Sequence, residues 1–235
     1  MRIAIMQPYL FPYIGYYSLI KNSDHFVFFD TPQYIRKGWI NRNRILSCSN
    51  EPIFFTVPIK KCDRNTAINA VYINNFTSWK EKIYGQLSVY KNKAPYYQDI
   101  LELIKTVLES EAQSISKLAI NSVKITSEYL GINKRFDVFS EMGIDDIQVD
   151  APDEWALYIA KRMGYDTYIN PPGGKVFFDA MKYKQEKINL FFLEQEIIPY
   201  KQIYGDFIPG LSIIDLLMFC TIDEINDMMN YFKMI

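Results

Sequence analysis

The first candidate site lies in the stretch QPYLFPYIGYY at residues 7–17, which follows an apolar run at residues 2–6. Gln7 offers a hydrogen-bond donor and an acceptor where that run ends. Gly15 lies where a helix would begin, so backbone N–H groups there can face a phosphate. Pro8 keeps the stretch out of regular structure, and Tyr13 and Tyr16 supply aromatic faces. We interpret these five residues as ligand contacts; the alternative is that the aromatic side chains only pack against a sheet edge.

The second candidate site is the stretch DTPQYIRKGWINRNRI at residues 30–45. Asp30 ends an apolar run with a carboxylate that could act as a general base. The polar and aromatic candidates behind it are Gln33, Tyr34, Trp39, Asn41, Arg42 and Asn43. Residues 31–64 carry seven basic residues, including Arg44 and Lys60, against two acidic ones. Because arginine binds phosphate through paired hydrogen bonds, the pattern indicates a phosphate-binding patch; the alternative is a solvated basic loop.

The third candidate site is the stretch NPPGGKVFFD at residues 170–179, after a predicted strand. Gly173 and Gly174 allow the backbone to approach a ligand closely, and Asn170 and Lys175 add polar and basic groups. The glycine–lysine spacing of a P-loop is absent, so this is not that motif. The alternative is a tight turn between a strand and a helix.

The fourth candidate site is the stretch YKQIYGDFIPGLSIIDLLMF at residues 200–219. We take Gln202 and Ser212 as candidate substrate contacts and Asp215 as a second candidate for the general base. Ser212 also fits the N-cap of a helix, and Asp215 fits its first turn, where an acidic group is favourable. The alternative is therefore that these residues only cap a helix.

Composition excludes several classes of protein. The net charge of −1 argues against a partner with many phosphates, such as a nucleic acid. Three separated cysteines and a single histidine, His25, argue against a disulfide framework, a zinc site and a Ser-His-Asp triad. No apolar stretch reaches the length of a membrane span and no signal peptide is recognisable, so we expect a cytoplasmic protein without a metal.

The order of apolar runs predicts an α/β fold. Residues 2–6 and 26–29 read as buried strands with a short helix between them, a unit that favours a parallel sheet. Residues 31–50 read as a polar loop. Further strands are expected at 53–59, 70–74, 136–140, 166–170 and 188–193, and helices at about 77–92, 95–109, 114–130, 150–164, 212–219 and 221–232. We expect one domain, 1–235, with a Rossmann-like, mostly parallel sheet and a helix-rich middle segment, in which 77–130 would be a helical insertion.

The N-terminal pattern resembles that of nucleotidyltransferases and pantothenate synthetase. Those proteins continue from a strand through a proline-containing loop and an HxGH motif into a helix. Tyr13 and Tyr16 stand where the two histidines would fall. A phenol cannot replace imidazolium at a transferring phosphate, so this resemblance implies the fold more than the activity.

Four blocks together resemble the WbqC-like family over nearly the whole chain. They are residues 7–45, FTSWKEKIYGQLSVYKNKAPYY at 76–97, the Asn-Pro-Pro-Gly-Gly-Lys block at 170–175, and residues 200–219. The first and last blocks are the most specific. One departure is Lys82-Ile83, where a Lys-His pair is expected, so a histidine role at that place does not transfer.

The resemblance implies a protein of surface-polysaccharide (O-antigen, lipopolysaccharide) biosynthesis that transfers an acyl or aminoacyl group, such as glycyl, to the amine of a nucleotide-linked amino sugar. Arg42, Arg44 and Lys60 would then hold the diphosphate. Trp39 or Tyr34 would stack on the base or sugar. The amides of Gln7 and Asn43 would orient the reacting atoms, and Asp30 or Asp215 would take the ammonium proton.

The sequence leaves other functions open. One alternative is an ATP-dependent nucleotidyltransferase or ligase, and another is a nucleotide-sugar-binding protein without catalytic activity. No cofactor is certain, and either ATP or an activated acyl donor would serve as co-substrate. The aromatic-rich composition, 16% of residues, would allow a homodimer.

Overall fold

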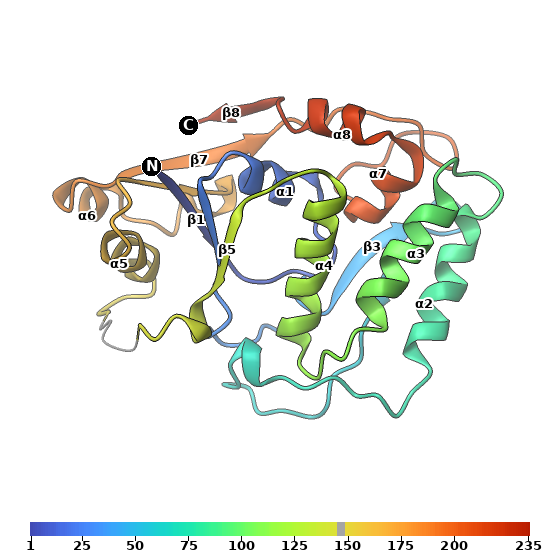
Figure 1. Cartoon of the computed structure of the whole chain (residues 1–235), viewed down its shortest axis with the longest axis horizontal. Helices are drawn as coiled ribbons and strands as arrows, with labels where there is room; N and C mark the ends of the chain where they lie inside the picture. The colour runs from blue at the N-terminus through green and yellow to red at the C-terminus, as the bar shows by residue number, and fades with distance from the viewer. Residues whose placement is uncertain (145–148) are drawn as a thin grey trace.

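The computed structural model describes residues 1–144 and 149–235. Its main sheet has six strands in the order β5-β2-β1-β6-β7-β8 (Figure 1). These strands are β1 (Arg2–Met6), β2 (His25–Phe28), β5 (Arg135–Val138), β6 (Thr167–Asn170), β7 (Asn189–Gln195) and β8 (Phe232–Met234). All neighbouring pairs are parallel except β7 and β8, which are antiparallel. The predicted α/β fold with a mostly parallel sheet is confirmed.

Helices cover both faces of this sheet, which explains its continuous apolar strands. On one face Ala4, Phe26 and Ile169 pack against three helices, α1 (Ile14–Lys21), α4 (Ile115–Tyr129) and α7 (Ile213–Phe219). On the other face Ile3 and Tyr168 pack against α5 (Glu154–Arg162) and α6 (Ala180–Gln185). The alternation of side chains along each strand therefore builds two cores, one on each side.

The middle of the chain forms a helical layer beside a hairpin. The hairpin consists of β3 (Arg42–Leu46) and β4 (Pro52–Thr56). It contacts α2 (Trp79–Leu87) and α7, and α3 (Tyr97–Leu108) packs on α4 (Figure 1). The predicted helices of this segment are confirmed.

Three local predictions were wrong. Residues 42–46, predicted as part of a polar loop, form β3. Residues 70–74 form no strand and make only single bridges, at Tyr72 and Ile73. The helix expected to begin after Asp150 begins at Glu154, with Asp153 at its N-cap. At the C-terminal end the predicted caps are confirmed: Ser212 caps α7, and α8 (Ile222–Met228) begins with a capping box. However, α8 is shorter than the predicted helix 221–232, because Phe232 begins β8.

The strand order creates a crevice between two strands. From β1 the chain passes through α1 to β2 on one side, whereas β6 pairs with the other side of β1. Ligands in open α/β sheets bind at the carboxyl ends of the strands at such a reversal. Gln7 directly follows β1, and Asn170 ends β6, so both lie at this point.

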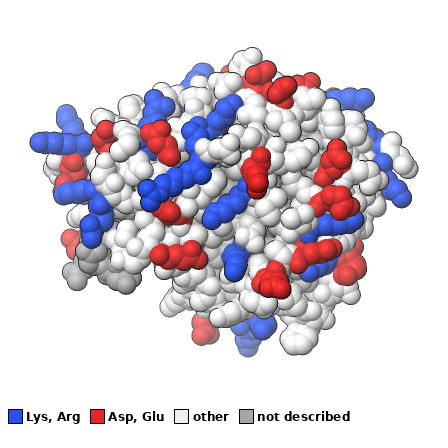
Figure 2. Space-filling view, in the orientation of Figure 1, with Lys and Arg blue, Asp and Glu red and all other residues white. Residues whose placement is uncertain are grey.

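The surface has no single dominant charge. Basic and acidic side chains are interspersed over the face shown in Figure 2, which agrees with the net charge of −1. In the part of the chain that the structure describes, no helix is both long and apolar enough to cross a membrane.

Candidate functional site

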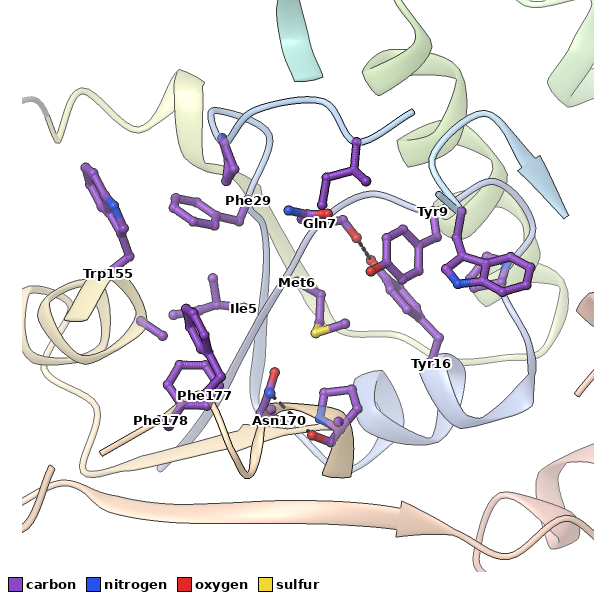
Figure 3. A pocket seen from close by; sticks show the side chains of 18 of the residues that line it. Ile5, Met6, Gln7, Tyr9, Tyr16, Phe29, Trp155, Asn170, Phe177 and Phe178 are labelled. Atoms are coloured by element: carbon purple, nitrogen blue, oxygen red, sulfur yellow. Dashed lines mark hydrogen bonds between the residues drawn. The ribbon is translucent and has the colours of Figure 1, made fainter. Parts of the chain in front are cut away.

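A cavity of about 1040 Å³ opens at the carboxyl ends of β1 and β6 (Figure 3). Several sequence-predicted site residues line it: Gln7, Tyr13, Tyr16, Trp39, Asn43, Asn170, Gly173 and Gly174. Arg44 lines it as well. Gly210 of the fourth candidate stretch lines it too, so the structure brings together residues from all four stretches, which are far apart in the sequence.

The other predicted residues do not line this cavity. They are Pro8, Gly15, Asp30, Gln33, Tyr34, Asn41, Arg42, Lys60, Lys175, Gln202, Ser212 and Asp215. Several of them support the residues that do. Tyr34 donates to Asn41 Oδ1 at 2.8 Å, and Asn41 donates to the Val57 carbonyl at 2.8 Å, which holds the hairpin in place.

The basic residues of the second stretch separate into two positions. Arg42 and Arg44 lie on the same strand, but only Arg44 reaches the cavity. The Arg42 guanidinium lies 4.0 Å from the centre of the Phe54 ring, and Lys60 lies 5.9 Å from the ring of Tyr72. The phosphate-binding role predicted for Arg42 and Lys60 remains a prediction, and the geometry favours Arg44 for it.

One part of the cavity, which we call the α1-side lobe, is lined by Tyr9, Tyr13, Tyr16, Trp39, Asn43 and Arg44. Arg44 Nη2 donates to the Gly210 carbonyl at 3.0 Å, and its guanidinium lies 5.6 Å from the ring of Trp39. Its Nε is buried and has no hydrogen-bond partner among the described residues. An arginine held in this way keeps donors for an anionic group.

The loop beneath the α1-side lobe is held by buried hydrogen bonds. Phe11 has a φ of 41°, an uncommon conformation for a residue with a side chain. Its N–H donates to Ser122 Oγ at 3.0 Å, and its carbonyl accepts from Asn43 Nδ2 at 2.8 Å and Ser212 Oγ at 2.7 Å. Asn43 also donates to the Leu10 carbonyl at 3.1 Å. These contacts enforce the unusual backbone that presents the cavity-lining residues.

The start of α1 is shaped by two tyrosines and a glycine. Tyr16 donates to the Gln7 carbonyl at 2.8 Å, and burial raises the pKa of Tyr16 well above its ordinary value, so the phenol stays a donor. A Cβ at Gly15 would lie 2.5 Å from the Tyr13 ring. Gly15 therefore lets Tyr13 fold over the first turn, and contact of Gly15 with a ligand remains a prediction.

Asn170 is held at the end of β6 between three groups. Tyr168 donates to Asn170 Oδ1 at 3.1 Å, and Asn170 Nδ2 donates to the Pro171 carbonyl at 3.3 Å. A Cβ at Gly174 would lie 2.0 Å from Asn170 Nδ2. The glycine is thus required for Asn170 to occupy this place.

The second part of the cavity, the α5-side lobe, lies across the end of β1 and is lined by Ile5, Phe29, Trp155, Ala156, Phe177 and Phe178 (Figure 3). None of these six residues was predicted from the sequence. Phe29 and Trp155 have ring centres 5.7 Å apart. Their positions in the sequence could have indicated three of the six residues, because Phe29 directly follows β2, and Phe177 and Phe178 follow the two glycines.

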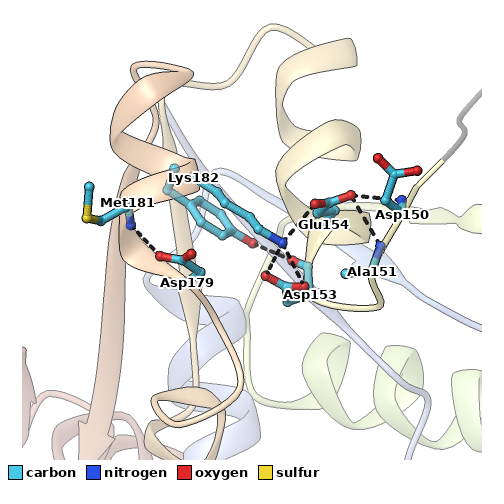
Figure 4. A network of polar contacts seen from close by, with 8 residues as sticks. Asp150, Ala151, Asp153, Glu154, Asp179, Met181 and Lys182 are labelled. Carbon is cyan, nitrogen blue, oxygen red and sulfur yellow. Dashed lines mark hydrogen bonds and ion pairs between the residues drawn. The ribbon is translucent and has the colours of Figure 1, made fainter.

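A network of ion pairs lies at the start of α5, next in sequence to the lobe residues Trp155 and Ala156 (Figure 4). Lys182 of α6 binds Glu154 Oε1 at 2.8 Å and Asp153 Oδ1 at 3.2 Å. The other Glu154 oxygen accepts from the backbone N–H of Asp150 at 2.9 Å and of Ala151 at 3.3 Å. The hydrogen bond from Lys182, followed by that from Asp150, lowers the pKa of Glu154. The network fastens the start of α5 to α6.

The two candidate bases are both engaged elsewhere. Asp215 is fully buried and accepts hydrogen bonds from Tyr90 at 2.6 Å, Tyr200 at 2.6 Å and Gln202 at 3.1 Å. Burial raises its pKa despite these bonds. Asp30 accepts from Ser140 Oγ at 2.7 Å. Hydrogen bonds of this kind hold distant parts of the chain together. A catalytic role for Asp30 or Asp215 remains a prediction.

Comparison with known proteins agrees with the resemblance noted above. A family model described as the WbqC-like protein family matches residues 7–227. This chain belongs to that family. It is 27% identical over 219 residues to Rv1507c of Mycobacterium tuberculosis, a protein described as uncharacterized, and the match covers 92% of each chain. No solved structure matches the chain.

The cavity of this WbqC-like protein offers a particular set of groups. Among the described residues, its polar side-chain groups are amides, phenols, the indole N–H groups of Trp39 and Trp155, one threonine hydroxyl and the guanidinium of Arg44. Outside residues 145–148, no Asp, Glu, His or Cys lines it, and no group of three or more such residues could hold a metal ion. The lining is suited to binding and orienting a ligand that carries rings and a negative charge.

Proposed function

We propose that this WbqC-like protein binds a nucleotide-linked amino-deoxy sugar and transfers an acyl or aminoacyl group to its amine, in the cytoplasmic synthesis of a surface polysaccharide such as O-antigen. The observation that carries the proposal is Arg44, which lines a cavity at a sheet crevice beside Trp39. Such a crevice is where open α/β sheets bind nucleotides. The guanidinium suits a diphosphate, and the indole suits a base or a sugar ring.

In the proposed reaction the sugar amine attacks the carbonyl carbon of the acyl donor. A C–N bond forms, the bond from that carbon to the leaving group breaks, and the leaving group departs with the bonding electrons. The amine loses one proton, to the leaving group or to water. The amides of Gln7 and Asn170 would orient the two reactants, and most of the rate would come from this positioning.

The proposal is tested by titrating the protein calorimetrically with a panel of UDP- and dTDP-linked amino sugars. Arg44→Gln should weaken binding about tenfold or more, because a charge-assisted hydrogen bond to phosphate contributes about 1.5–3 kcal/mol. Arg42→Gln is the matched control, since Arg42 lies on the same strand but outside the cavity, and it should change affinity less than twofold. Equal effects of the two substitutions would contradict the assignment of Arg44.

One observation favours a second candidate, a binding protein without catalysis: no carboxylate or imidazole of the described chain lines the cavity. Incubation with the bound amino sugar and candidate acyl donors separates the two, because acylation raises the mass of the sugar. Binding without any product in the presence of acyl thioesters and acyl adenylates would favour the second candidate.

A further inference from the structure

The two lobes of the cavity differ in chemistry. The α1-side lobe contains Arg44, Asn43 and three phenols, whereas the six side chains that define the α5-side lobe are aliphatic or aromatic and uncharged. Figure 3 shows Gln7 between the two, with Trp155 and Phe177 on one side and Tyr9 and Tyr16 on the other. The polar and apolar halves are therefore separated by the residue that follows β1.

Among the described residues, the side chains that define the α5-side lobe carry no charge, and their one hydrogen-bonding group is the indole N–H of Trp155. Ile5 and Ala156 form the buried floor of this lobe, and the phenol of Tyr168, which also lines the cavity, already donates to Asn170. The charges of Lys182 and Glu154 are paired with each other and do not line the cavity. Burying a polar group there without a hydrogen bond would be unfavourable, while burying hydrocarbon would be favourable.

The rim of this lobe also exposes apolar surface. Phe177 is 51% exposed and lines the cavity, and its side chain lies beside Phe178, with ring centres 5.0 Å apart. A large apolar side chain exposed at the mouth of a cavity is typical of a ligand site. The whole cavity, at about 1040 Å³, is at the upper end of the size range of ligand pockets, so it has room for two ligands.

We propose that the α5-side lobe binds the hydrocarbon part of the acyl donor, so that the transferred group is an apolar acyl group rather than glycyl. The reaction context rests on the function proposed above, but the binding site does not. With an acyl thioester as donor, the sugar nitrogen bonds to the acyl carbon and the carbon–sulfur bond breaks. The thiolate leaves and takes up the proton that the amine loses, which gives an amide and a free thiol.

The test uses N-acetylcysteamine thioesters of acetate, butyrate, hexanoate and glycine, with binding measured by calorimetry. Affinity should rise about threefold to fourfold with each added methylene group, as expected for burial of hydrocarbon. The glycyl thioester should bind no better than the acetyl thioester. An affinity that does not depend on chain length, or a preference for glycyl, would overturn the proposal.

Two variants locate the effect. Phe177→Ala should lower hexanoyl affinity about fivefold or more through lost apolar contact. Val176→Ala is the matched control, because Val176 is adjacent but 98% exposed and does not line the cavity, and it should leave the affinity unchanged. Equal effects would overturn the assignment. Ala156→Leu, which adds volume to the floor of the lobe, should flatten the dependence on chain length while UDP binding is retained.

The same titrations separate this inference from the proposed function. If the chain-length series is steep but no nucleotide sugar binds, the proposed function fails and the apolar site stands. If nucleotide sugars bind through Arg44 but the series is flat, the apolar site fails and the proposed function stands.

Discussion

The two walls of the cavity are held by different physical means. The α1-side wall, residues 7–13, is fixed by buried hydrogen bonds at Phe11: its carbonyl accepts from Asn43 and Ser212, and its N–H donates to Ser122. The α5-side wall is fixed by aromatic contacts and by the ion pairs that Lys182 makes with Glu154 and Asp153, which are partly exposed. Buried hydrogen bonds are insensitive to salt, whereas exposed ion pairs are screened by it.

This difference matches what each lobe requires. Recognition of a charged group depends on donors held at fixed angles and distances, and the α1-side wall supplies such a frame around Arg44. Burial of hydrocarbon depends mainly on area and has no preferred direction, so the α5-side wall needs less exact support. The polar half of the cavity is thus built on the more strongly fixed wall.

The largest effect should come from the buried cluster behind the α1-side wall. Asp215→Ala would leave the buried hydroxyls of Tyr90 and Tyr200 without their acceptor, whereas the amide of Gln202 would keep the Ile208 carbonyl. Each unsatisfied buried group costs about 1–3 kcal/mol, so the free energy of unfolding should fall by about 3 kcal/mol or more in urea titrations. Asp206→Ala, at an exposed residue nearby, should change it by less than about 0.5 kcal/mol. Similar losses in both variants would show that the cluster adds little.

A smaller loss of stability is expected from a substitution at the hydrogen bonds that hold the α1-side wall. Asn43→Ala removes both bonds from the amide to the Leu10 and Phe11 carbonyls. The free energy of unfolding should fall by about 2 kcal/mol, and UDP affinity should fall with it because the uncommon backbone at Phe11 loses support. Retention of both stability and affinity would show that Ser122 and Ser212 suffice to hold the loop.

The sequence predicted most of the main sheet because its parallel strands are continuous apolar runs. It missed β3 because the residue on the inner side of that strand is polar: Asn43 is 3% exposed, yet its hydrogen bonds are satisfied by the loop at Leu10 and Phe11. A buried, satisfied asparagine is indistinguishable from a loop asparagine until its partners are known. The strand pattern was therefore hidden by a tertiary contact.

The candidate site could also be predicted only in part, because some of its features depend on tertiary contacts. The rule that open sheets bind ligands at strand ends predicted the neighbourhood of Gln7 and Asn170, because it depends only on strand order. Whether a carboxylate such as Asp30 faces a cavity or Ser140 depends on contacts across 110 residues. Trp155 and Phe177 were missed because an aromatic residue near a helix or turn reads equally well as core packing.

Gly174→Ala, at the boundary between the two lobes, should cause a moderate loss of stability. The added Cβ would lie 2.0 Å from Asn170 Nδ2 and 2.7 Å from the Phe178 ring, so one of them must move, at a cost of about 1–3 kcal/mol. Gly173→Ala is the matched control, because nothing lies within 4 Å of a Cβ there. Thermal unfolding should separate the two variants, and equal melting temperatures would mean that Asn170 is free to rotate away.

The smallest effect, and the one that distinguishes the two walls most directly, should come from Glu154→Gln. The pKa of Glu154 is lowered from its ordinary value of 4.5 by Lys182 and the Asp150 N–H. Its contribution to stability is therefore present above about pH 4.5 and is lost as the pH falls through the lowered pKa. The stability difference between wild type and Glu154→Gln should thus shrink as the pH falls below 4.5. It should also shrink in about 1 M salt, where charges more than about 3 Å apart are largely screened.

The loss of stability caused by Asn43→Ala should be the same at low salt and in about 1 M salt, because the hydrogen-bond partners of Asn43 are backbone carbonyls. If salt reduced both losses equally, the two walls would not differ in the way that their contacts indicate.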